Sequence, residues 1–147
     1  MDQRDSEITA AVMRFRNVIE NNNDCLPDHL KDFPAGCCSD VSDLLATHLS
    51  SEGFGDFDLI SAQRGSYGDQ ENPFRTHAWL RQGNLTIDIT ADQFPDFQQP
   101  VLVSNSSPWH ERFEIRDLRP AGLIWISGPI RPALDEAYQC LRRQLSQ

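Results

Sequence analysis

The chain has 147 residues, 39% apolar and 24% charged, with a formal net charge of −9 at pH 7. This length and composition suit one globular domain with a substantial core, and we expect a single domain over 1–147. The negative charge, without a basic stripe, disfavours nucleic acid and anionic membrane surfaces as partners. Because we find neither a secretory leader nor 18 consecutive apolar residues, we expect a cytoplasmic protein without a membrane span.

The first predicted element is a helix. Apolar residues recur at helical spacing from Ile8 to Ile19, and Asp5 or Ser6 is the expected N-cap. The turn-forming run at 21–24 should end this helix.

A second helix should follow an irregular stretch at 25–36 that holds two prolines and ends in glycine. Its expected start is Cys37 or Cys38, and Gly53 is a natural stop.

Strands dominate the rest of the chain. The polar stretch 65–74 predicts an exposed loop, and 75–90 predicts a β-hairpin turning at Gly83-Asn84. Further strands are expected at 57–65, 101–104, 113–116 and 123–127, and a last helix from about Pro132. The pattern predicts one α+β domain.

The hairpin register predicts a His–Asp pair. If Gln82 pairs with Leu85, His77 and Asp88 become diagonal neighbours on one face, about 7–8 Å apart at the backbone. Side-chain alternation also places Trp79 and Thr90 on that face. The opposite face is then apolar and carries Ala78, Leu80, Leu85, Ile87 and Ile89. Such a pair is either a structural hydrogen bond or the base and orienting acid of an active site.

Four cysteines lie at positions 25, 37, 38 and 140. In a reducing compartment we expect all four to be thiols, and their spacing does not suit a structural zinc site. A cysteine at a helix start lies among unpaired backbone N–H groups, which favour the nucleophilic thiolate and can stabilise an oxyanion. The alternative is that both adjacent cysteines pack in the core.

These residues resemble the transglutaminase-like superfamily of papain-fold cysteine enzymes. The resemblance rests on Gly36-Cys37-Cys38 opening a helix, "HAWL" from His77 and "DIT" from Asp88, and covers 33–94. It implies an antiparallel sheet with the nucleophile-bearing helix packed on it. The implied triad is Cys38 as nucleophile, His77 as base and Asp88 as orienting acid, with no cofactor or metal.

The resemblance leaves several roles open. Cys37 is the alternative nucleophile. No side chain obviously matches the oxyanion donor of papain-type enzymes, so the candidates are Asn22, Asn23, Gln93 or backbone N–H groups alone. Trp79 is expected to shield the His–Asp pair or to line the cleft.

The expected function is thiol-dependent acyl transfer from an amide in a peptide, a protein or a small molecule, by a peptidase, amidase, deamidase or transglutaminase-like enzyme. Two alternatives remain. One is an arylamine N-acetyltransferase-like enzyme, and the other is an inactive papain-fold module whose acidic surface binds a basic partner. The sequence leaves the oligomeric state open.

The other histidines are expected to have no role in catalysis. Trp109-His110 is interpreted as an exposed aromatic beside a solvated histidine, and the alternative is that the pair lines a substrate cleft. His29 and His48 are interpreted as structural or solvated.

Overall fold

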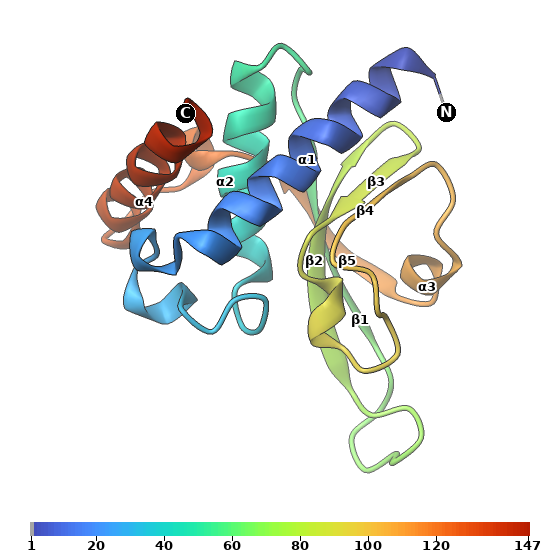
Figure 1. Ribbon diagram of the computed structural model, residues 1–147. Coiled ribbons are helices and arrows are strands. Elements are labelled where there is room, and N and C mark those ends of the chain that lie inside the picture. Colours follow the sequence, from blue (N-terminus) through green and yellow to red (C-terminus); the bar gives the residue numbers. More distant parts are fainter. Residues whose placement is uncertain (1) are drawn as a thin grey trace.

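The computed structural model describes residues 2–147 and has helices on both sides of an antiparallel sheet (Figure 1). The five strands are ordered β4-β3-β2-β1-β5, which confirms the expected α+β class. The strands are β1 (Asp58–Arg64), β2 (Arg75–Gln82), β3 (Leu85–Asp88), β4 (Leu102–Ser104) and β5 (Glu114–Pro120). The helices are α1 (Gln3–Asn21), α2 (Cys38–Ser51), α3 (Pro108–Glu111) and α4 (Ile130–Leu145), with 3-10 turns η1 (Asn23–Cys25), η2 (Asp28–Leu30), η3 (Ala91–Gln93) and η4 (Leu123–Trp125).

The sheet has an apolar core on each face. Helices α1, α2 and α4 cover one face, and the short helix α3 lies on the other (Figure 1). The first core contains Ala78 and Leu80 of β2 together with the buried sides of these three helices. Between them in sequence, Trp79 faces the second core, which also holds Trp109 and Phe113. Successive side chains of β2 therefore alternate between the two cores.

The predicted hairpin is confirmed. Gln82 pairs with Leu85 and Leu80 pairs with Ile87, so the loop has two residues. The first of them, Gly83, has φ +59°, a left-handed conformation that glycine adopts without strain. The expected apolar face is also confirmed, because all five of its residues are buried in the first core.

Two helix starts and one predicted strand differ from expectation. Helix α1 is capped by Asp2, whose carboxylate accepts a hydrogen bond from the Asp5 amide at 2.7 Å, so this helix begins before the expected cap. The strand expected at 123–127 is the 3-10 turn η4, which follows Gly122 with φ +129°. A short apolar run is consistent with either structure, because it is too short for a period to be visible. Helix α4 begins two residues before Pro132.

The expectation of four thiols is wrong. Cys25 of η1 and Cys140 of α4 form a disulfide across 115 positions of sequence, with their Cα atoms 5.5 Å apart, whereas Cys37 and Cys38 are free. The sequence spacing could not reveal this pair because packing of α4 against η1 brings it together.

The disulfide also bears on the location of the protein. Disulfides persist mainly in oxidising compartments, so the Cys25–Cys140 bond argues against a cytoplasmic location. The cytoplasmic location remains a prediction from the sequence. Within residues 2–147, no helix has the length and apolar character needed to cross a membrane.

Candidate active site

The start of α2 separates the two adjacent cysteines. Gly36 precedes them with φ +72°, a conformation that an L side chain rarely adopts. Cys37 is the N-cap, and its side chain is buried in the first core at 3% exposure. Cys38 is the first helical residue and is only partly buried. Within residues 2–147 no side chain caps this helix, so its first backbone N–H groups remain available to a ligand.

Cys38 lines a pocket of about 340 Å³ together with His77. The neighbouring strand β1 contributes Gln63, and β5 contributes Arg116. The helix that bears Cys38 and the strand that bears His77 therefore meet at one solvent-accessible pocket. The spacing of the motifs in the sequence did not by itself require this.

The predicted His77–Asp88 contact is confirmed. The two side chains are buried, and His77 Nε2 lies 2.7 Å from Asp88 Oδ2. Thr90 holds the carboxylate from its other side, because its backbone amide donates to Asp88 Oδ1 at 2.9 Å. This local bond, between residues two apart, is the turn that Asp and Asn side chains commonly form. It explains the Asp-Ile-Thr spacing.

A second imidazole shares the same carboxylate. His110 is 4% exposed, and its Nε2 lies 2.6 Å from Asp88 Oδ2, while its Nδ1 lies 2.5 Å from the Ser107 hydroxyl. The interpretation of Trp109-His110 as an exposed pair is therefore wrong, since both residues are buried. The missed signal was local: Ser107 is the N-cap and Pro108 the first residue of α3, a helix start that orders the two residues after it.

The charges of this cluster shift its pKa values. Burial alone would lower the pKa of His77, but the charge and hydrogen bond of Asp88, with a smaller contribution from Cys38, raise it to about 9. Burial alone would raise the pKa of Asp88, but His77 and His110 hold it well below its usual range. At neutral pH the pair is therefore an imidazolium and a carboxylate.

One ring nitrogen of His77, Nδ1, remains available for proton transfer. Asp88 is ionised and can only accept, so Nε2 of His77 donates to it. Nδ1 is buried and makes no hydrogen bond within residues 2–147. Nδ1 is thus the atom left to exchange a proton with a group in the Cys38 pocket.

Cys37 has the opposite character. Burial, as the largest cause, and the neighbouring Cys38 raise the pKa of its thiol to about 12. A thiol with that pKa is almost fully protonated at neutral pH, and only the thiolate is nucleophilic. Of the two candidates, Cys38 is the one whose surroundings suit a nucleophile.

The side chains proposed as oxyanion donors do not line this pocket. The Asn22 amide donates to the Val18 carbonyl at 2.9 Å at the end of α1, and the Gln93 amide donates to the Thr90 carbonyl at 3.0 Å. Both amides are used in local bonds that end an element. Trp79 lines no part of this pocket either, but its ring centroid is 5.8 Å from that of His77 and 4.7 Å from that of His110. This position agrees with its expected shielding role.

Arg16 of α1 anchors the segment that follows Asp88. Its side chain is buried and donates to the Ile89 carbonyl at 2.6 Å and to both carboxylate oxygens of Asp92 at 2.9 Å. Because these bonds flank Thr90, the helix on one face of the sheet holds the loop that positions Asp88. Sequence reasoning placed Arg16 only within a helix.

His77, Asp88 and His110 also have the donor atoms of a metal site. Their ligand atoms lie within 4.8 Å of one another, and two imidazoles with a carboxylate suit several divalent metals. Here the two Nε2 atoms and Asp88 Oδ2 already satisfy one another through hydrogen bonds of 2.6–2.7 Å. Coordination would have to replace both bonds.

Comparison with known proteins gives partial matches only. The chain is 35% identical over 75 residues to YuaU of Escherichia coli, an uncharacterised protein, in strains K12 and UTI89. The match covers 51% of this chain and 34% of the relative, so the chain spans about a third of the length of these curated relatives. Neither a family model nor a solved structure matches the chain.

Proposed function

We propose that the protein is a cysteine-dependent enzyme that acts on amide bonds, with a papain-like, transglutaminase-like arrangement of Cys38, His77 and Asp88. One observation carries the proposal. The free cysteine Cys38 begins a helix that no side chain within residues 2–147 caps, and it shares a pocket with a buried histidine whose other nitrogen is held by an ionised aspartate.

In the first step, the Cys38 sulfur attacks the carbonyl carbon of the amide and forms a C–S bond. The backbone N–H groups at the start of α2 stabilise the oxyanion that develops, since the candidate side-chain donors are engaged elsewhere. As the C–N bond breaks, His77 Nδ1 gives its proton to the leaving amine. Asp88 stabilises the imidazolium before this transfer.

In the second step, the acyl group leaves Cys38. A water molecule or an amine attacks the thioester while His77 Nδ1 accepts its proton, and the C–S bond breaks to restore the thiolate. Water gives hydrolysis or deamidation, and an amine gives transfer. The pocket is open to both.

His110 acts in this scheme as a positioning residue. It donates a second hydrogen bond to Asp88 Oδ2, which fixes the carboxylate in the geometry that His77 needs. This bond also draws charge from Asp88 and so limits how strongly Asp88 raises the pKa of His77.

The test is the rate of alkylation by iodoacetamide as a function of pH, mapped to each free cysteine by mass spectrometry. Cys38 should react rapidly near neutral pH, whereas Cys37 should react slowly because its thiol is buried and protonated. His77→Ala should slow Cys38 markedly, and Cys37→Ala, the matched control, should leave the Cys38 rate unchanged.

Two outcomes would redirect the proposal. If Cys38 reacts no faster than an ordinary thiol in the folded protein, the inactive binding module becomes the better explanation. If an acyl-CoA transfers its acetyl group to Cys38, the arylamine N-acetyltransferase-like alternative gains support.

A further inference from the structure

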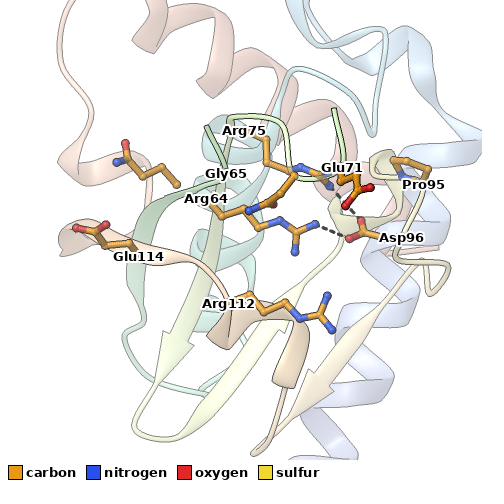
Figure 2. Close-up of a pocket in the computed structure, with 10 residues that line it drawn as sticks. Arg64, Gly65, Glu71, Arg75, Pro95, Asp96, Arg112 and Glu114 are labelled. Carbon is orange, nitrogen blue, oxygen red and sulfur yellow. Dashed lines mark hydrogen bonds and ion pairs between the residues drawn. The ribbon is translucent and has the colours of Figure 1, made fainter. Parts of the chain in front are cut away.

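A second, larger pocket adjoins the candidate active site. It has a volume of about 680 Å³, and Gln63 of β1 lines it as well as the Cys38 pocket. Its charged lining includes Arg64, Arg75 and Arg112. Figure 2 shows their side chains converging on the side of the pocket where Asp96 lies.

Arg64 is a fixed cation in the wall of this pocket. Its side chain is 7% exposed and forms an ion pair with Asp96. Its guanidinium carbon lies 5.3 Å from the ring centroid of Trp109 and 5.0 Å from that of Phe113. Its Nε and Nη1 atoms are buried and make no hydrogen bond within residues 2–147. A buried charge with so few partners is costly, so further negative charge nearby is stabilising.

The pocket lining holds three guanidinium groups and three carboxylates, but one of these carboxylates is shared by two arginines and another pairs with Arg116 outside the lining. Asp96 is shared between Arg64 and Arg75, whose Nη1 lies 3.2 Å away. Arg112 forms no ion pair with any residue in 2–147.

Two other carboxylates complete the local charge. Glu114 pairs with Arg116 at 2.9 Å and extends away from the three guanidinium groups (Figure 2). Glu71, on the exposed loop 65–74, is the remaining carboxylate in the lining. With Glu114 neutralised by Arg116, three cations face two anions. This local excess of positive charge lies in a chain whose net charge is −9.

The loop that carries Glu71 is held at a fixed place beside the pocket. Gly65 begins it with φ +82°, and a Cβ atom there would lie 2.0 Å from the Pro73 carbonyl oxygen. Only glycine permits this close approach, through which the Ser66 amide donates to the Asn72 carbonyl at 3.0 Å. The rim is thereby shaped before any ligand enters.

We propose that this pocket binds the anionic group, a carboxylate or a phosphate, of a small ligand or peptide side chain. Guanidinium groups present paired N–H donors that match both kinds of oxyanion. The volume lies in the range typical of small-molecule sites. Because Gln63 separates the two pockets, a ligand bound here reaches toward Cys38, but anion binding itself does not depend on any chemistry at Cys38.

The test is a titration of the full chain with inorganic phosphate and, separately, with glutarate, followed by the backbone amide NMR signals of Gly65 and Arg112. We expect saturable shifts at these signals. Arg112→Gln should weaken binding about tenfold, the loss expected for one charge-assisted hydrogen bond. Glu71→Gln removes a negative charge from the lining and should strengthen binding severalfold.

Arg143→Gln is the matched control, because it removes the same charge from an exposed position in the last turn of α4. It should leave both affinities nearly unchanged. Saturation by phosphate alone identifies a phosphate ligand, and saturation by glutarate alone identifies a carboxylate ligand. The absence of saturable shifts with both anions, or equal weakening by Arg112→Gln and Arg143→Gln, would overturn the proposal.

Discussion

The shared carboxylate of Asp88 is the residue-scale feature on which the candidate site depends. It accepts hydrogen bonds from His77, His110 and the Thr90 amide, all of them buried. Because His77 is buried, removing the charge of Asp88 leaves burial as the main influence on the pKa of His77.

Asp88→Asn should therefore lower the pKa of His77 from about 9 to below its ordinary value of 6.5, measured by NMR titration of the imidazole. The sign for stability follows from the raised pKa. In the wild type, His77 contributes stability that is fully present below pH 6.5 and is lost as the pH rises through about 9. The unfolding free energies of wild type and variant should consequently converge over that interval, and a constant difference would contradict the assignment.

His110 makes a second prediction at this scale. His110→Phe keeps an aromatic ring but removes the donor to Asp88, so Asp88 should attract the proton of His77 more strongly and raise the pKa of His77 further. The measurement is again the His77 titration, with the pH profile of Cys38 alkylation beside it. His110→Gln restores an N–H donor and should return the profile toward wild type. If His110 only fills space, neither profile will move in the two variants.

At the scale of elements, the disulfide between η1 and α4 stabilises the layer of helices on one face of the sheet. The disulfide joins two segments that also pack on each other and on α1. Cross-linking such distant positions restricts the unfolded chain.

The double variant Cys25→Ala, Cys140→Ala should lose about 2–5 kcal/mol of unfolding free energy, measured by urea denaturation without a reducing agent. Cys37→Ala is a control without a cross-link. An independent check is the thiol count of the unfolded, unreduced protein. It should show Cys37 and Cys38 alone, and four reactive thiols would refute the bond.

Elements also show where sequence reasoning succeeds. The hairpin was predictable to the residue because a two-residue turn and strict alternation leave one register that buries five apolar side chains. The structure of the run at 123–127 was not predictable. A short apolar stretch has no visible period, and Gly122 before it turns the backbone.

At the scale of the whole molecule, two unlike cores sandwich the sheet. The core beneath α1, α2 and α4 is mainly aliphatic, whereas the core beneath α3 is built from aromatic rings around His77. His77 is buried in the second core, yet it lines the pocket that Cys38 reaches from α2. The candidate site thus lies where the two layers meet at the ends of β1 and β2.

The sequence by itself determined the α+β class, a helix that begins at Cys37 or Cys38, and the contact between His77 and Asp88. These features depend on local periodicity and on one tight turn, and both act over a few residues. The tertiary structure alone decided that His110 shares Asp88, that Cys25 pairs with Cys140, and that three arginines line one pocket. Each of these features joins residues from separate elements. Packing of the layers brings those elements together, and the local spacing of residues in the sequence does not indicate it.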